Sequence, residues 1–378
     1  MNWEQKRFSQ IVTISKGEAI TKASENEGPY PVILGGQEPA YYIDRYNHEG
    51  EAIVISRSGA SAGYASFWNE PIFITDGYLV EPTAGNHRKY IYYLLKYYGK
   101  ALRDLQNGAA IPHVTPKTLY NLKAPIPPLT IQKRIAGTLS TYDKLIEVNN
   151  KRIKVLEQMA ENLYKEWFVR FRFPGHENVE FENGIPKGWE YCTVESLSDI
   201  CQRGISPDYD DAGELTVISQ KCIRQNIMDI NEARKHTKAF KPELNLVDGD
   251  TVICSTGTGT LGRVGQVYGG FPDTTFDSHV TLVRAKTGIG KHFLYWSLKE
   301  MQPWFMNMGI GSTNQQELYR GTIKNAKTLK PDDSLIMRFE NIVEPIHQSI
   351  ISLINSQENL IQQRDLLLPR LMSGKLEV

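Results

Sequence analysis

The clearest hydrophobic pattern lies in two long segments that repeat each other. From Ile131 to Pro174 the chain has no internal proline, and apolar residues recur at alternating spacings of three and four. This spacing predicts an amphipathic helix with a coiled-coil seam. A similar series follows 204 residues later. The seam includes Ile135, Leu139, Ile146, Ile153, Leu156 and Leu163 in the first helix and Ile350, Leu353, Leu360 and Leu367 in the second.

Each predicted helix has about 37 residues and a length of about 55 Å. Gln357 and Arg364 are polar intrusions in the second seam. Pro345 predicts a kink or a later start for the second helix, because proline disrupts a helix interior. A long amphipathic helix packs against a partner, and here each helix has its duplicate. If a pseudo-two-fold axis relates the copies, the two helices pair antiparallel.

The segments ahead of the two helices also match each other in order. Trp3 corresponds to Trp189, and the stretches 53–56 and 252–255 both lead from apolar residues into a loop rich in glycine and hydroxyl residues. The offset between matches grows from 186 residues at the tryptophans to 203 between positions 90 and 293. Shared order with a growing offset predicts a tandem duplication with insertions in the second copy.

The pattern therefore predicts a mixed α/β (α+β) fold built as an internal repeat, globule–helix–globule–helix. We expect a first domain over residues 1–128, a central spacer helix over 129–172, a second domain over 173–332 and a C-terminal spacer helix over 333–378.

Composition narrows the function without deciding it. Lys+Arg and Asp+Glu both number 43, so a histone-like polycation is excluded but a local basic patch is not. The four cysteines form no CxxC pair, so we expect no metal site. With no signal peptide and no apolar run of 18 residues, we expect a cytoplasmic protein that does not contact the membrane.

One loop resembles a nucleotide-binding motif. Residues 257–262, Gly-Thr-Gly-Thr-Leu-Gly, satisfy the dinucleotide fingerprint. That fingerprint needs a helix next, whereas residues 264–268 are typical of a strand. Neither a P-loop nor a methyltransferase motif occurs. We therefore expect a glycine-rich turn, and keep a nucleotide-binding enzyme that uses Gly257 to Gly262 as an unfavoured alternative.

Several segments together resemble the specificity (S) subunits of type I restriction-modification systems. Residues 126–135 (Ile-Pro-Pro-Leu-Thr-Ile-Gln-Lys-Arg-Ile) open the first helix, and residues 163–168 (Leu-Tyr-Lys-Glu-Trp-Phe) close it. Residues 185–189 (Ile-Pro-Lys-Gly-Trp) begin the second copy, and 364–375 (Arg-Asp-Leu-Leu-Leu-Pro-Arg-Leu-Met-Ser-Gly-Lys) end the chain's second helix. The resemblance covers essentially the whole chain.

This resemblance implies two tandem target-recognition domains, each of which reads one half of a bipartite target in double-stranded DNA. It implies that the helices set the spacing and that their seam residues dock two methyltransferase (M) subunits, through which restriction (R) subunits assemble. The chain itself would be non-catalytic and without cofactor, with S-adenosylmethionine, ATP and magnesium on its partners. A purely structural coiled-coil scaffold is the remaining alternative.

Candidate DNA-binding residues are polar side chains on turn-like loops of both copies. Arginine and glutamine can read base edges, whereas serine, threonine and lysine more often contact phosphates. The candidates are Gln37, Arg57, Ser58, Ser61 and Tyr64 in the first domain and Gln220, Lys221, Arg224, Thr256, Thr258, Arg263, Gln315 and Gln316 in the second.

Overall fold

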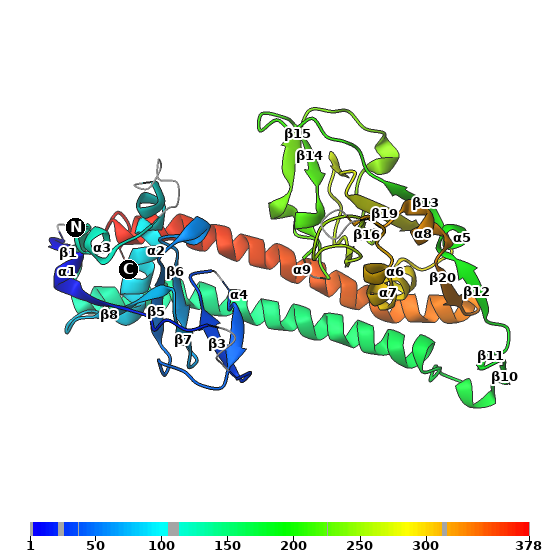
Figure 1. Ribbon diagram of the computed structural model, residues 1–378, viewed down its shortest axis with the longest axis horizontal. Coiled ribbons are helices and arrows are strands. Elements are labelled where there is room, and N and C mark those ends of the chain that lie inside the picture. Colours follow the sequence, from blue (N-terminus) through cyan, green and yellow to red (C-terminus); the bar gives the residue numbers. More distant parts are fainter. Residues whose placement is uncertain are drawn as a thin grey trace. The chain divides into compact units, whose positions relative to one another are not determined.

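The computed structural model describes residues 3–21, 26–36, 38–104, 113–224, 226–311 and 316–377. The chain divides into two compact units. The first unit comprises residues 1–148 and 356–378, and the second comprises residues 149–355. The two longest helices each contribute one part to each unit (Figure 1).

The first unit contains three small sheets. The largest is antiparallel with strand order β2-β8-β5-β6, a second has the order β4-β3-β7 with β3 and β7 parallel, and the third pairs β1 with β9. The elements are β1 (Glu4–Arg7), α1 (Phe8–Ile11), β2 (Val12–Lys16), β3 (Tyr30–Ile33), β4 (Tyr41–Ile43), β5 (Ala52–Ser56), the 3-10 turn η2 (Gly59–Ser61), β6 (Ala65–Trp68), β7 (Phe73–Ile74), β8 (Gly77–Pro82), α2 (Arg88–Asp104), α3 (Pro116–Tyr120) and β9 (Lys123–Ile126).

The second unit repeats this topology and adds a two-stranded antiparallel sheet, β10-β11. Its repeated sheets have the orders β13-β19-β16-β17, β15-β14-β18 and β12-β20, and β14 and β18 are again parallel. The strands and helices are β10 (Phe181–Glu182), β11 (Ile185–Pro186), β12 (Glu190–Thr193), α5 (Val194–Leu197), β13 (Ser198–Arg203), β14 (Leu215–Ile218), β15 (Arg234–His236), β16 (Thr251–Cys254), β17 (Val264–Gln266), β18 (Thr274–Phe276), β19 (Val280–Ala285), α6 (Lys291–Glu300), α7 (Gln302–Asn307), α8 (Arg320–Asn325) and β20 (Lys327–Lys330). The single-turn elements are η4 (His176–Asn178), η5 (Gln220–Cys222), η6 (Ile230–Glu232) and η7 (Pro242–Leu244). The predicted mixed fold and its internal repeat are confirmed.

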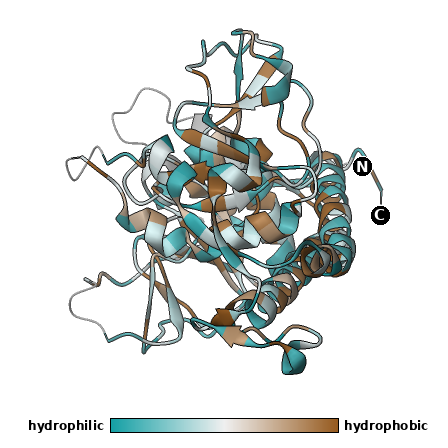
Figure 2. Ribbon diagram, turned by 90° about the vertical axis from the view of Figure 1, so that its right-hand side faces the viewer, coloured by the Kyte–Doolittle hydropathy of each residue, from teal (hydrophilic) through white to brown (hydrophobic). Residues whose placement is uncertain are grey.

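Two long helices, α4 (Leu129–Tyr164) and α9 (Asp333–Met372), account for the repeated hydrophobic series. A π-helical turn, η3 (Lys165–Val169), extends α4. Both helices interleave hydrophobic and hydrophilic residues along their sequence. Figure 2, which views them nearly end-on, shows residues of both kinds on their ribbons. The helix bounds lie near the expected ones, whereas the division into four functional domains stays a prediction.

Within each unit the two helices run antiparallel. In the first unit Asp143 of α4 forms a 2.7 Å ion pair with Arg364 of α9. In the second unit Ile153 packs with Ile350. Arg364 therefore occupies a seam position because its guanidinium has a carboxylate partner.

Helix α9 begins at Asp333 and continues through Pro345, so the expectation of a later start was wrong. A proline in a helix interior costs about 3 kcal/mol. The turns ahead of it bury Leu335, Ile336 and Phe339 almost completely. Each such side chain contributes roughly 1.5–3 kcal/mol, so burial outweighs the cost of the proline.

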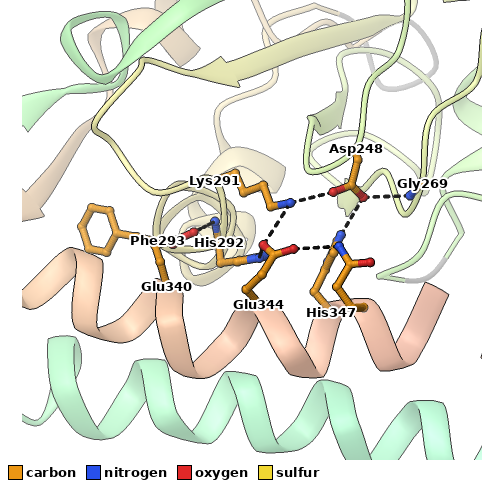
Figure 3. Close-up of polar contacts among 9 residues, drawn as sticks. Asp248, Gly269, Lys291, His292, Phe293, Glu340, Glu344 and His347 are labelled. Atoms are coloured by element: carbon orange, nitrogen blue, oxygen red, sulfur yellow. Dashed lines mark hydrogen bonds and ion pairs between the residues drawn. The ribbon is translucent and has the colours of Figure 1, made fainter. Parts of the chain in front are cut away.

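A network of buried polar contacts joins α9 to the second unit's sheets and to α6 (Figure 3). Glu340 accepts hydrogen bonds from the backbone N–H groups of His292 (3.3 Å) and Phe293 (2.8 Å), which lie in the first turn of α6. These amides have no partner inside their own helix, so the carboxylate satisfies donors that burial would otherwise leave unpaired.

Two further carboxylates complete this network, which we call the polar latch. Lys291 lies 2.6 Å from Asp248 and 3.1 Å from Glu344. His292 contacts Glu344 at 2.9 Å, and His347 contacts Asp248 at 2.7 Å. The latch consists of Asp248, Lys291, His292, Glu340, Glu344 and His347.

Burial and hydrogen bonding shift the pKa values of three latch residues in different directions. Burial raises the pKa of Glu340 to about 7. Burial, reinforced by His347, lowers the pKa of His292 to about 4, so the imidazole is neutral near pH 7. Burial opposes ionisation of Glu344, but hydrogen bonds from Gln348, His292 and Lys291 prevail and lower its pKa to about 2.

We predict that the stability advantage of the wild type over a His292→Gln variant narrows as the pH falls from 7 to 4.5. Below pH 6.5 the unfolded wild-type chain binds a proton that the folded chain excludes until about pH 4. The difference in free energy of unfolding should therefore shrink by roughly 2–3 kcal/mol, as denaturant titrations at several pH values can measure. Glu340 titrates in both proteins and cancels; an unchanged difference contradicts the assignment.

Candidate nucleic-acid interface

In the second unit, three loops come together at the carboxyl ends of strands β14, β16 and β18. Backbone hydrogen bonds hold the loops in place: Asp277 N–H donates to Ile218 O at 2.9 Å, and Ser255 N–H donates to His279 O at 2.8 Å. Side chains that follow three separated strands are thereby brought to one edge of the unit.

Polar side chains from these three loops form a connected chain, which we call the 220–256–279 triad. The Thr256 hydroxyl lies 3.1 Å from Gln220 Oε1 and 2.7 Å from His279 Nδ1. His279 is exposed, whereas Gln220 and Thr256 are half-buried. The triad thus presents polar groups to solvent from side chains whose orientation is fixed by neighbours.

The buried residue Asp277 stabilises the loop that carries His279. Its side chain is 2% exposed, and its Oδ1 accepts a hydrogen bond from the His279 backbone N–H at 2.9 Å. Burial raises the pKa of Asp277 although that hydrogen bond and the His279 ring act in the opposite direction. The carboxyl group fixes the turn from which the histidine projects.

An ion pair lies beside the triad. Arg203, at the end of β13, contacts Glu317 and donates from Nη2 to Leu318 O at 2.8 Å. Glu317 in turn forms an isolated β-bridge with Thr256. The segment at 317–318 is therefore tied to the same loop edge.

The other candidates of the second unit are distributed around this edge. Lys221, Thr258 and Gln316 are exposed, and Arg263 is half-buried. Exposed Arg224 donates from Nε to Lys221 O at 3.2 Å and lies 3.8 Å from Glu232. Gln315 lies outside the described residues. The glycine-rich stretch 257–262 leads into strand β17 rather than into a helix, as a turn would and a dinucleotide site would not.

The equivalent edge of the first unit uses different chemistry. Asp76 lies 2.7 Å from both the Arg57 guanidinium and the Ser58 hydroxyl. Ser61 lies in the η2 turn beside them, and Gln37 lies outside the described residues. The Asp76 carboxylate thus brings Arg57 and Ser58 together, and Asp76 is not among the residues predicted from the sequence.

Tyr64 lies between the η2 turn and β6 and is half-buried. Burial raises the pKa of its hydroxyl, Arg364 lowers that pKa and Asp143 raises it. Its role in DNA binding stays a prediction.

Sequence reasoning missed Asp76, Arg203, Asp277, His279 and Glu317. The sequence carries one signal for them: residues 76–80 and 277–281 occupy corresponding places in the two copies, and each stretch begins with an aspartate. Asp76 directly precedes β8, and Asp277 lies three residues before β19, the strand at the equivalent position in the largest sheet. The role of these aspartates became visible only with the loops in place.

The seam residues proposed to dock partner subunits are largely occupied within the chain, which corrects that expectation. Ile135, Leu139 and Leu367 pack in the core of the first unit, and Ile153, Leu156, Ile350 and Leu353 pack together in the second. Leu163 packs against the second unit's main core, while Ile146 and Leu360 are half-buried. Large apolar side chains that remain exposed on the helices are Leu129, Leu145, Val148, Val155 and Met159 on α4 and Met337, Ile342 and Leu366 on α9.

Over the residues that the structure describes, no cluster of three histidine, cysteine or acidic side chains is arranged to hold a metal ion. Within the same residues, no helix combines the length and apolar character needed to cross a bilayer.

Known proteins resemble this chain in sequence and in fold. The family model for the type I restriction modification DNA specificity domain matches residues 1–158. The type I restriction enzyme MjaIX specificity subunit of Methanocaldococcus jannaschii is 27% identical over an alignment that covers 100% of this chain and 94% of that protein. The chain is thus similar over its whole length to a type I restriction enzyme specificity subunit, and its residues 1–158 match the model of the DNA specificity domain.

Two further proteins are similar to this chain. The MjaVIII specificity subunit of the same organism is 28% identical over 71% of this chain and 65% of its own length. The crystal structure of a type I restriction-modification S subunit from M. genitalium superposes with a TM-score of 0.60 at 18% identity, over 98% of this chain and 96% of that one. The latter shows that the whole chain shares the fold of a specificity subunit.

Proposed function

We propose that this chain is a specificity subunit whose two repeated domains each read one half of a bipartite target in double-stranded DNA. The observation that carries the proposal is the recurrence of a polar loop edge at equivalent strand ends in two copies of one fold. Arg57 and Ser58 follow β5 in the first unit, and Thr256 follows the equivalent strand β16 in the second. Two similar scaffolds with different side chains suit two different half-sites.

The paired helices are the elements that we propose to set the spacing between the half-sites. Antiparallel pairing in both units supports this role, because a helix of 36 residues paired with one of 40 is a stiff connection.

We further propose that two methyltransferase subunits dock on the exposed apolar residues of the helices, and that restriction subunits join through them. Exposed apolar side chains aligned along a helix are typical of a protein contact. Catalysis, S-adenosylmethionine, ATP and magnesium are then assigned to the partners, and this chain recognises DNA.

Exchange of residues 1–128 for the first domain of another specificity subunit tests whether each domain recognises its half-site independently. We expect one half of the methylated sequence to change while the other half stays the same. Methylome sequencing of a host that expresses the hybrid with its methyltransferase subunits measures this outcome. A change in both halves, or in neither, contradicts the proposal; the reciprocal exchange of residues 173–332 is the matched control.

Lengthening both helices tests the spacing role. Seven residues inserted between 148 and 149 in α4, with seven between 355 and 356 in α9, add about 10 Å and keep nearly the same helix face. At 3.4 Å per base pair, the unread gap should grow by about three base pairs. Methylation of duplexes with graded gaps gives the answer, and an unchanged optimum would count against the helices as spacers.

Polar substitution of the exposed helix face tests partner docking. Val155 and Met159 are 59% and 52% exposed, so Val155→Ser with Met159→Ser should leave the melting temperature nearly unchanged. Loss of two apolar contacts should weaken binding of a methyltransferase subunit roughly tenfold or more. Val247→Ser, 42% exposed but outside the helices, is the control. Equal affinity of the double variant and the control excludes this face.

A further inference from the structure

His279 combines two properties that rarely occur together at a surface: its side chain is exposed, and its ring is held in a fixed orientation. Nδ1 lies 2.7 Å from the Thr256 hydroxyl, while the backbone N–H is bound by buried Asp277 and the backbone carbonyl by Ser255 N–H. Nε2 makes no hydrogen bond within the part of the chain that the structure describes. A fixed ring with one unused nitrogen is preorganised to bind a ligand.

The positions of the protons in the triad determine whether Nε2 of His279 is a hydrogen-bond donor or acceptor. The Thr256 hydroxyl has one proton, and it donates that proton to the amide oxygen of Gln220. The hydroxyl oxygen must then accept its second hydrogen bond from His279 Nδ1–H. A neutral imidazole protonated at Nδ1 carries a lone pair on Nε2, so the exposed nitrogen is an acceptor.

An acceptor on this edge selects among the bases. In the major groove only adenine N6 and cytosine N4 offer amino donors, whereas guanine and thymine present acceptors. The amide nitrogen of Gln220 remains available as a donor at the same edge. Every base pair contains one amino-bearing base and one guanine or thymine, so Nε2 is suited to contact the adenine or cytosine of the pair that it reads and not its guanine or thymine partner.

We propose that His279 is a base-reading residue of the second domain, whose Nε2 accepts a hydrogen bond from the exocyclic amino group of an adenine or cytosine in the second half-site. Thr256 is a positioning residue, because its hydroxyl fixes the imidazole orientation. This assignment rests on the proposed reading of DNA by the second domain.

The test uses the full chain assembled with its methyltransferase subunits. Binding is measured on duplexes in which each base pair of both half-sites is substituted in turn, for the wild type and for His279→Ala. We expect discrimination at one base pair of the second half-site to fall roughly 5- to 150-fold, as loss of one base contact implies. The first half-site should be read as before. His176→Ala, a histidine in the same unit but outside the loop edge, should leave every position unchanged.

Variants of Thr256 separate positioning from folding. Thr256→Val removes the hydroxyl at nearly constant shape and should relax discrimination at the same base pair. Thr256→Ser restores the hydroxyl and should recover it. A structural role alone would change the melting temperature without selecting one base pair, so thermal unfolding of each variant is recorded alongside.

The outcomes distinguish this inference from the proposed function. If the wild-type assembly reads two half-sites and His279→Ala reads them identically, the role of His279 is wrong while the proposed function stands. At the affected pair, removal of the exocyclic amino group (purine in place of adenine, or 2-pyrimidinone in place of cytosine) should weaken binding of the wild type but not of His279→Ala. Equal sensitivity of the two proteins overturns the amino-base assignment. If the wild-type assembly shows no bipartite preference, the proposed function itself fails.

Discussion

Burial of the apolar seams of α4 and α9 within the chain is the constraint on which the other features depend. In the first unit the seam closes the core around Ile135 and Leu139, and in the second it packs Ile153 against Ile350. Because the seam is filled by the chain itself, only side chains on the remaining helix faces are available to partners. Burial around Phe339 also holds α9 helical up to and through Pro345.

Polar contacts then determine how the second unit's α9 segment is attached to its sheets. The latch places Glu340, Glu344 and His347 of α9 against Asp248 and the start of α6 (Figure 3). Charged groups lose solvation on burial, so they stabilise this junction only when their partners are in place. A junction of this kind is specific in geometry, which suits a helix that must hold a recognition surface in a defined orientation.

The two units share one scaffold, but they carry different side chains at the loop edge. The three sheets have the same strand orders in both units, whereas the residues at the equivalent edge differ. Asp76 binds an arginine and a serine in the first unit, and Asp277 supports a turn that carries His279 in the second. Under the proposed function, a supporting carboxylate near the same strand in both units, with different partners in each, lets one architecture read two sequences. The formal net charge of zero agrees with recognition by local groups rather than by a uniformly basic surface.

The sequence by itself determined the two long helices, the duplication and the glycine-rich turn, because periodicity and turn chemistry are encoded by residues that are close along the chain. Only the tertiary structure decided that the seam is filled from within and that Gln220, Thr256 and His279 meet. Those residues are separated by 36 and 23 positions along the chain. Their contact depends on which strands pair, a non-local outcome that no single segment encodes.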